Sequence, residues 1–165
     1  MNPFHNFDKI LRSRWRLKLF FLKVLPLGFF TGLRVDEVSD QGTVVSVPFK
    51  YLNKNPFASM YFAVQSMAAE LSTAIIALRV ISKAPVPVSM LVLKMEAEFT
   101  KKATTRIAFR CDEAREIEQA VRESLDTGQG RTVTVTTTGT NEQGQVVSVF
   151  HITWTFKPKL KSKTK

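Results

Sequence analysis

Hydrophobic residues repeat with helical spacing in three segments of the chain. The first segment, from Asp8 to Lys23, has apolar side chains at three- and four-residue steps, which predicts an amphipathic helix. Its apolar residues are Leu11, Trp15, Leu19 and Leu22. The second, from Met60 to Ser82, is apolar on nearly every face and predicts a largely buried helix. The third, from Asp112 to Asp126, predicts a helix with Asp112 as its N-cap.

Apolar and polar residues alternate in six further segments, and this period of two predicts β-strands. The segments come in three consecutive pairs, each joined by a short turn. They are 29–38 with 43–49, 88–100 with 104–111, and 131–138 with 145–157. The expected fold class is α+β, with an antiparallel sheet of about six strands wrapped around the long central helix. One helix precedes the sheet, and another lies between its fourth and fifth strands.

The length of 165 residues fits one domain with appended ends. We expect an N-terminal helix at 1–25, a sheet-and-helix domain at 26–157 and a disordered basic tail at 158–165. An open sheet leaves edge strands whose backbone groups can pair with another chain. We therefore expect a homodimer with a continuous sheet.

Positive charge gathers near the two ends of the chain. The formal net charge is +10. One cluster of Lys and Arg residues lies between Lys9 and Lys23, and a second cluster of Lys residues lies at the C-terminal end. Because the interior is much nearer neutral, a nucleic-acid partner is not expected. Two interpretations of the basic N-terminal helix remain open. It packs on its own domain or on a partner subunit, or it makes a weak contact with a membrane surface.

Cysteine content and motifs exclude several classes of site. Cys111 is the only cysteine, so no internal disulfide or cysteine-based zinc cluster is expected. The chain has no GxSxG elbow, Gly-rich phosphate loop or HExxH motif, and its two histidines are His5 and His151. The apolar stretch 17–30 is interrupted by Lys and Pro, so we expect neither a signal peptide nor a spanning helix there. A cytoplasmic location follows from these expectations.

Two polar residues stand out against the apolar central helix. Glu70 lies in its middle, where a carboxylate is costly unless it is hydrogen-bonded or needed for function. Asn55 precedes Pro56 in the loop that leads into the helix, where an Asn either holds a turn or serves a site. Together they match the needs of thioester hydrolysis, which are a carboxylate to deprotonate water, an amide, and unpaired N–H groups at a helix start.

The residues around this pair resemble a known family. Residues 53–62 followed by 68–71 are similar to the hot-dog thioesterases of the phenylacetate-degradation type, in a bacterial branch of that acyl-CoA thioesterase superfamily. In that pattern an acid follows the loop Asn at an interval of fifteen residues, which Asn55 and Glu70 reproduce. The family's His-Gly pair falls on Tyr61 and Phe62, and the acid is Glu rather than the more frequent Asp.

The resemblance implies a hot-dog fold that hydrolyses acyl-CoA or acyl-carrier-protein thioesters as a homodimer or a dimer of dimers. The implied catalytic groups are Glu70, Asn55, the backbone N–H of Phe62 and the hydroxyl of Ser89. The implied contacts with substrate or coenzyme A are Lys101, Lys102, Arg106, Tyr61 and Met67. Coenzyme A enters only as part of the substrate, and no metal is expected.

Helix geometry adds one expectation without the resemblance. Phe62 and Glu70 are eight residues apart, and a rise of ~1.5 Å per residue separates their backbones by about 12 Å along one helix. One thioester cannot easily touch both, so the two groups of a site should come from different chains. Two other classes of function remain as alternatives. They are a non-catalytic acyl-thioester or lipid binder, and a basic membrane-associated interaction protein.

Overall fold

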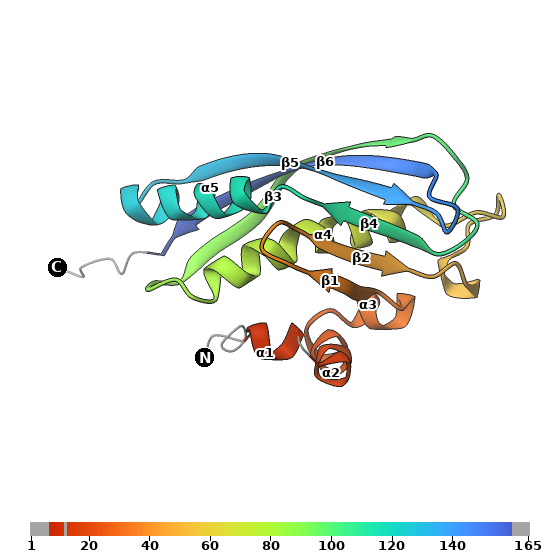
Figure 1. The fold of residues 1–165 in the computed structure, drawn as a ribbon, viewed down its shortest axis with the longest axis horizontal. Helices are drawn as coiled ribbons and strands as arrows, with labels where there is room; N and C mark the ends of the chain where they lie inside the picture. Colours follow the sequence, from red (N-terminus) through yellow and green to blue (C-terminus); the bar gives the residue numbers. More distant parts are fainter. Residues whose placement is uncertain (1–6, 12, 160–165) are drawn as a thin grey trace.

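Six strands form one antiparallel sheet that curves around the longest helix, α4 (Figure 1). The computed structural model describes residues 7–11 and 13–159, so the expected tail lies outside the described residues from residue 160 onward. The strands are β1 (Arg34–Val38), β2 (Thr43–Val47), β3 (Val88–Phe99), β4 (Ile107–Cys111), β5 (Arg131–Thr140) and β6 (Val146–Pro158). Their order across the sheet is β1-β2-β4-β5-β6-β3. The α+β prediction is confirmed.

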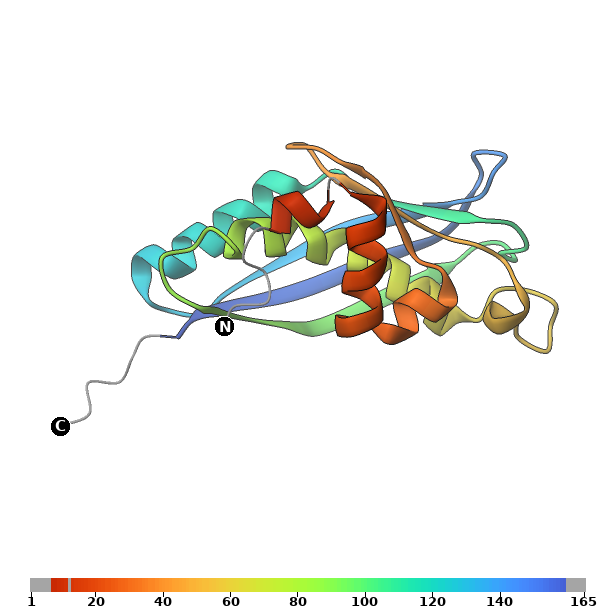
Figure 2. The same cartoon turned by 90° about the horizontal axis from the view of Figure 1, so that it is seen from below.

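Helices occupy three places around this sheet. They are α1 (Phe7–Leu11), α2 (Arg14–Val24) and α3 (Pro26–Thr31) before β1, α4 (Phe62–Ile81) after a short 3-10 turn at Tyr51–Asn53, and α5 (Ala114–Thr127). Figure 2 shows α1 to α3 on the outside of the molecule and α5 beside the C-terminal part of α4. The central helix was expected at 60–82, and the structure confirms it to within two residues.

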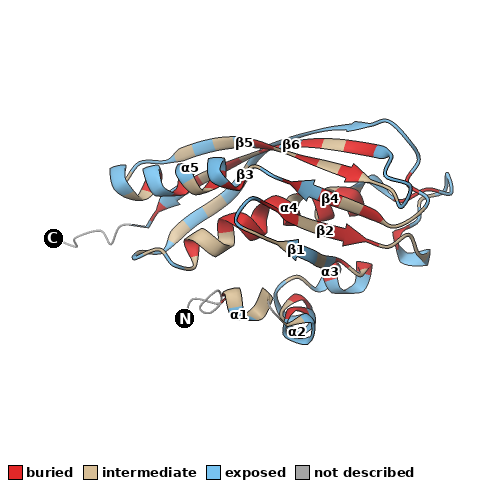
Figure 3. Cartoon of the chain, viewed as in Figure 1, coloured by how far each residue is buried: buried red, intermediate tan, exposed pale blue. Residues whose placement is uncertain are grey.

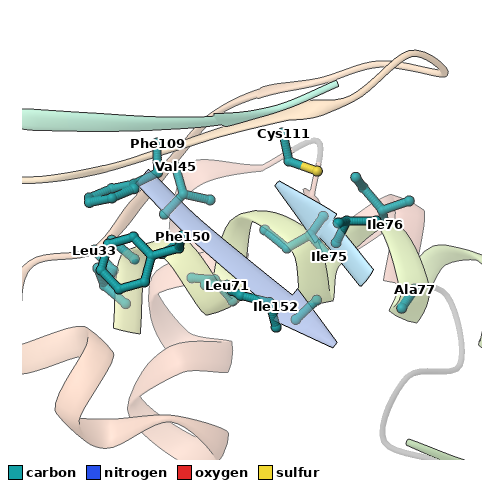
Figure 4. Packing of buried hydrophobic residues seen from close by; sticks show 14 of the residues in the cluster. Leu33, Val45, Leu71, Ile75, Ile76, Ala77, Phe109, Cys111, Phe150 and Ile152 are labelled. Atoms are coloured by element: carbon teal, nitrogen blue, oxygen red, sulfur yellow. The ribbon is translucent and has the colours of Figure 1, made fainter. Parts of the chain in front are cut away.

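The core lies between α4 and the concave face of the sheet. Figure 3 shows α4 buried along much of its length, and Figure 4 shows apolar side chains from α4 meeting those from the strands. The rings of Phe109 and Phe150 meet edge to face at 5.7 Å between centroids. By length and hydropathy α4 would also suit a membrane span, but most of it is buried inside the protein. It is the core helix of the fold.

Hydrogen bonds between α4 and the sheet fix the rotation of the helix about its axis. The indole Nε1 of Trp154 donates to Thr73 Oγ1 at 2.8 Å, and Ser148 Oγ donates to Gln65 Oε1 at 3.0 Å. The hydroxyls of Ser72 and Thr137 lie 2.8 Å apart. Because these polar groups are buried, rotating α4 would leave them without partners. These bonds hold the sheet-facing side of α4 in place. They therefore also determine the direction in which Glu70, on the other side of the helix, points.

The pairing of β3 differs from the simplest expectation. β3 and β4 are consecutive in the chain, yet β3 pairs only with β6, whereas β4 lies between β2 and β5. β3 is therefore an edge strand of 12 residues, and most of its residues are exposed. Met95 and Phe99 lie opposite buried positions of β6, but the two side chains remain 36% and 47% exposed. The concave face of the sheet is thus uncovered along this edge.

The N-terminal region corrects two predictions. The helix expected from Asp8 to Lys23 is two helices, because Ser13 is extended and its side chain accepts a hydrogen bond from the backbone N–H of Arg16 as the N-cap of α2. The strand expected from Phe29 starts only at Arg34. Pro26 begins the helix α3 instead, and Gly32 ends it with a φ of 81° in the left-handed region.

The N-cap expected for α5 is also wrong. Glu113 takes that position without capping the helix through its side chain, and its carboxylate accepts instead from the backbone N–H of Thr136 at 3.0 Å. Asp112 accepts from Arg110 at 3.2 Å and forms an ion pair. Ile117 and Val121 of this helix are fully buried, as its apolar spacing in the sequence suggests.

Candidate active site

The N-terminal half of α4 has one face that the sheet does not cover. Ser66 and Met67 lie three and four residues after Ala63, and Glu70 lies four and three residues after them, so the four residues share this one face. None of the four is fully buried, whereas Val64, Ala68 and Leu71 on the other side are buried. The predicted residues Met67 and Glu70 are therefore neighbours on an open surface of the core helix. We call these four residues the open face of α4.

The carboxylate of Glu70 is not held by a partner. Among residues 7–11 and 13–159, no side chain or backbone group donates a hydrogen bond to it or forms an ion pair with it. Burial raises the pKa of Glu70 from 4.5 to about 7, because a low-dielectric environment disfavours the charged form. A carboxyl group with a pKa near neutrality can both accept and return a proton at physiological pH.

The N-terminus of α4 presents unpaired backbone donors to the surface. Tyr61 is the N-cap residue and makes no side-chain capping bond, although its carbonyl accepts from the N–H of Val64 at 3.0 Å. In the described part of the chain the N–H of Phe62, the first helical residue, has no acceptor. This donor lies at the positive end of a 20-residue helix dipole. The predicted oxyanion donor is thus available, with its own side chain 54% exposed beside it.

Asn55 organises the loop that precedes α4. Its Oδ1 accepts from the backbone N–H groups of Phe57 at 3.0 Å and Ser59 at 3.2 Å, and its Nδ2 donates to Ser59 Oγ at 3.0 Å. The loop includes Ala58 at a φ of 56°, a left-handed conformation that these bonds help to hold. Of the two roles open to Asn55, the turn role is therefore observed. Its amide makes these bonds within the loop rather than with Glu70.

A pocket of about 400 Å³ lies beside the N-terminus of α4. Its lining brings together four of the predicted residues, namely Asn55, Phe62, Lys101 and Lys102. The backbone N–H of Met60 donates to Ala103 O at 2.7 Å. This bond connects the loop before α4 to residues 101–103, which we call the basic turn because it contains Lys101 and Lys102. Lys101 has no ion-pair partner among the described residues, and Lys102 reaches only the carbonyl of Phe57, at 3.4 Å. The pocket therefore has two cationic groups available for an anionic ligand.

Five predicted residues do not line this pocket, namely Arg106, Ser89, Glu70, Tyr61 and Met67. Arg106 donates to Ser46 Oγ at 3.2 Å and is not part of the lining. Ser89 is exposed near the beginning of β3 and pairs in register with Lys157, ten residues away from Phe99 at the pocket end of the strand. At ~3.3 Å per residue this is a separation of about 33 Å. Glu70 lies two turns along α4 from the pocket.

Sequence reasoning missed two polar neighbours of the candidate site, Ser66 and Gln65. Ser66 precedes Glu70 by one helical turn on the open face, and its hydroxyl donates to Phe62 O at 3.0 Å. Gln65 lines the pocket although it is nearly fully buried. The rings of Phe62 and Phe99 lie 6.5 Å apart at the pocket wall. The four-residue step from Ser66 to Glu70 was the signal that could have revealed the first of these.

Within the described ranges, no group of three His, Cys, Asp or Glu side chains is arranged to hold a metal ion. The groups that could take part in chemistry are therefore the carboxylate of Glu70, the N–H of Phe62 and the ammonium groups of the basic turn. α4 begins at Phe62, so the separation of about 12 Å from Phe62 to Glu70 holds along a continuous helix. Within one chain, the backbone N–H of Phe62 and the carboxylate of Glu70 therefore do not meet.

Comparisons with known proteins give a family and a fold. The model of a family described as a domain of unknown function (DUF4442) matches residues 13–156. No curated protein matches the chain. Among solved structures, a protein from Pseudomonas aeruginosa described as a probable thioesterase is similar with a TM-score of 0.74 and 21% identity, over 88% of this chain and 97% of that one.

Two further solved structures carry the name thioesterase. One from Haemophilus influenzae has a TM-score of 0.66 and 11% identity, over 92% of this chain and 94% of that one. One from Staphylococcus aureus has a TM-score of 0.59 and 17% identity, over 81% of this chain and 99% of that one. The Staphylococcus protein was solved as a Gln-to-Ala and as a Glu-to-Ala variant, at positions fifteen residues apart. These likenesses confirm the hot-dog fold.

Proposed function

Because the chain belongs to the DUF4442 family, whose description specifies no activity, we propose a function from its fold and site. The protein is a thioesterase that hydrolyses acyl-CoA or acyl-carrier-protein thioesters at sites shared by two subunits. The observation that carries the proposal is Glu70, an unpartnered carboxylate on the open face of α4 with a pKa raised to about 7. A structural carboxylate in this position would be expected to have a hydrogen-bond or ion-pair partner.

The proposed reaction uses Glu70 as a general base. Its carboxylate takes a proton from a water molecule as the water oxygen attacks the thioester carbonyl carbon. The carbonyl oxygen becomes an oxyanion, which the N–H of Phe62 and the helix dipole stabilise. When the C–S bond breaks, the sulfur leaves with the proton that Glu70 had taken. The products are a carboxylic acid and a free thiol, and Glu70 returns to its starting state.

Two subunits complete each site in this proposal. Edge pairing of β3 with β3 of a second copy would satisfy the unpaired backbone groups of a long edge strand. It would also cover exposed apolar side chains along the uncovered edge of the sheet and at the start of α4, namely Tyr61, Phe62, Met95 and Phe99. A two-fold axis there would place Glu70 of one chain opposite the α4 N-terminus of the other, giving two equivalent sites.

The pocket and the structural neighbours support the proposed substrate class. Lys101 and Lys102 offer charge to the phosphates of coenzyme A or of a carrier-protein prosthetic group. Proteins that share the fold carry the name thioesterase. The fifteen-residue interval between the substituted Gln and Glu of the Staphylococcus protein equals the interval between Asn55 and Glu70. Both observations support thioester hydrolysis.

The test is a thiol-release assay across a panel of acyl-CoA esters with Glu70→Gln, which keeps the size of the side chain and removes its charge. We expect hydrolysis to fall by ~10² to 10⁴, because that is the usual contribution of a positioned general base. Glu142→Gln, in an exposed turn far along the chain, is the matched control and should keep full activity. A fully active Glu70→Gln protein would exclude Glu70 as the base.

A second outcome of that assay separates the alternative function. Phe62 stands where the resembling enzymes have Gly, so its side chain narrows the space beside the oxyanion donor. If the native protein binds acyl-CoA but releases no thiol, the chain is an acyl-thioester binder. Calorimetric titration with a non-hydrolysable acyl-CoA analogue measures this binding directly.

A further inference from the structure

The helix α2 packs on the protein through one face and leaves a second apolar face in solvent. Leu17 and Phe21 are buried, at 7% and 4% exposure. The opposite side carries Trp15, Leu19 and Leu22, which are 75%, 59% and 45% exposed and lie at helical steps of four and three residues. This outward stripe is the apolar pattern that predicted the helix, so the pattern does not mark the side that packs on the domain. We call it the α2 stripe.

Basic side chains border the α2 stripe on both sides. At about 3.6 residues per turn, Arg14 and Lys18 lie along one border and Arg16 and Lys23 along the other. In the described part of the chain none of these four forms an ion pair with a carboxylate. The ammonium group of Lys18 lies 5.9 Å from the centre of the Trp15 ring. No acidic residue occurs between Asp8 and Asp36, so the charge of the region is uncompensated.

A groove of about 400 Å³ runs beside the Arg14–Lys18 border, between α2 and the start of β1. Its lining includes the apolar side chains of Leu17, Phe21 and Leu33. Three cationic residues also line it, namely Arg14, Lys18 and Arg34. Of these only Arg34 has an anionic partner among the described residues, Asp36 at 3.4 Å. An apolar groove with cations beside it suits a molecule that has both an anionic and a hydrocarbon part.

We propose that the α2 stripe and this groove form a docking surface for a membrane that contains anionic phospholipids. The stripe inserts its apolar side chains at the level of the lipid headgroups, and its basic borders contact the phosphates. The groove takes one headgroup beside the helix. The next helix, α3, adds the exposed side chains of Leu27 and Phe30 at the C-terminal end of α2. Figures 1 and 2 show α2 at the periphery of the molecule, next to α3.

This surface is independent of the proposed thioesterase site. It uses α2 and α3, whereas the candidate site uses α4, β3 and the basic turn. A membrane fits better than a protein partner because an apolar stripe with unpaired cations along both borders is typical of helices that lie in the lipid interface. A protein interface would usually deplete charge at its centre and pair it across the rim.

The test measures binding of the full-length protein to phosphatidylcholine vesicles with and without phosphatidylglycerol, by flotation. We expect binding only with phosphatidylglycerol. The variant Arg14→Gln with Lys18→Gln should weaken this binding roughly 30-fold, because each basic residue near an anionic surface contributes about 1 kcal/mol and 1.4 kcal/mol is tenfold. The variant Trp15→Ala with Leu19→Ala should also weaken it while the circular dichroism spectrum stays native, since both side chains are exposed.

Two controls remove the same number of charges elsewhere. Arg115→Gln with Lys157→Gln acts on exposed residues of α5 and β6, and Lys161→Gln with Lys163→Gln acts in the C-terminal run outside the described residues. Both controls should bind vesicles within about threefold of the wild type, as expected when screening limits distant charges. Equal loss in either control, or binding to neither vesicle, would overturn the proposal. A change of oligomer mass in the α2 stripe variant without a change in flotation would assign the stripe to a protein contact instead.

Discussion

Burial and ionisation oppose each other at Glu70. The surroundings of this side chain raise its pKa to about 7, so the neutral form is favoured in the folded protein at mildly acid pH. Hydrolysis, by contrast, requires the charged form as the proton acceptor. Ionisation of Glu70 therefore lowers the free energy of unfolding of the chain but is needed for its proposed activity.

Activity and stability should respond to pH with opposite signs. We expect kcat/KM for acyl-CoA hydrolysis to rise with pH and level off above a midpoint near 7, as the carboxylate of Glu70 loses its proton. Because the folded pKa is raised, stability from the neutral carboxyl is fully present below pH 4.5 and is lost as pH rises through about 7. The loss should reach up to about 3 kcal/mol, because each tenfold change in proton affinity between the unfolded and folded chain corresponds to about 1.4 kcal/mol.

Urea denaturation of the wild type and of Glu70→Gln from pH 4 to 8 measures this loss, because the amide has no charge to bury. The two proteins should differ little at low pH and diverge as pH rises, with Glu70→Gln the more stable. Parallel stability curves over the whole range would show that the pKa of Glu70 is not raised in the folded state.

For single residues, the sequence predicted which side chains are functional candidates better than it predicted their hydrogen-bond partners. Glu70 could be singled out because a carboxylate in an apolar helix has a cost that composition alone reveals. The bonds of Asn55 within its own loop could not, since they depend on the path of the backbone around Ala58. The position of Arg106 against Ser46 likewise depends on which strands become neighbours.

At the scale of elements, α4 owes its orientation to buried hydrogen bonds with the sheet. In the core, the indole N–H of Trp154 donates to the hydroxyl of Thr73. At the surface, the hydroxyls of Thr134 and Thr153 form a hydrogen bond of 2.8 Å between β5 and β6. The two pairs allow the value of burial to be measured directly. Breaking a buried pair leaves an unsatisfied donor, whereas water replaces the partner at an exposed one.

We expect Thr73→Val to destabilise the protein by about 1 to 3 kcal/mol, because it keeps the shape of the side chain but leaves the indole N–H of Trp154 without an acceptor. Thr134→Val is the matched control and should cost less than about 0.5 kcal/mol. Urea denaturation at one protein concentration gives both values, with an unchanged m-value showing that the denatured state is the same. Equal effects of the two substitutions would mean that the Trp154 bond does not anchor α4.

Elements with a strong period were predicted well, and short ones near turns were not. The structure confirms the long helix and the two strands of the final hairpin. In long elements, burial of one face imposes a regular spacing of apolar residues over many positions, which makes the pattern easy to recognise. The break between α1 and α2 depends on one capping serine, Ser13, within a continuous helical pattern. Similarly, Phe29 to Thr31 lie in the segment predicted as the first strand but belong to the helix that Pro26 begins.

At the scale of the molecule, the proposed site needs a second copy of the chain to complete it. The sequence predicted the number of strands, but not that β3 would lie at the sheet edge beside β6. Strand order depends on long-range packing, which a local pattern does not encode. The edge position of β3 is nevertheless what makes a shared site geometrically possible.

A mixed dimer tests the shared site. Phe62→Pro deletes the N–H at the first helical position, where proline is well tolerated and where the preceding Tyr61 is already extended, with φ −61° and ψ 132°. We expect this chain and Glu70→Gln each to be inactive alone. Co-refolded in equal amounts, they should recover about a quarter of wild-type activity, because half the dimers are mixed and each restores one of two sites.

Phe62→Ala, which keeps the N–H, is the control for loss of the aromatic side chain and should remain active. If mixed dimers isolated with two affinity tags show no activity, each site lies within one subunit. If the native protein sediments as a monomer at the concentration of the assay, the proposed dimer is wrong.

The burial of Cys111 has a practical consequence for all of these experiments. This thiol is fully buried at the end of β4, and burial raises its pKa to about 11, so it is neither accessible nor ionised in the folded protein. Thiol-specific dyes added to follow coenzyme A release will therefore not be consumed by the folded protein itself. The same side chain becomes reactive once β4 separates from β2 and β5. The rate at which a dye labels Cys111 therefore reports how often the core of the protein opens.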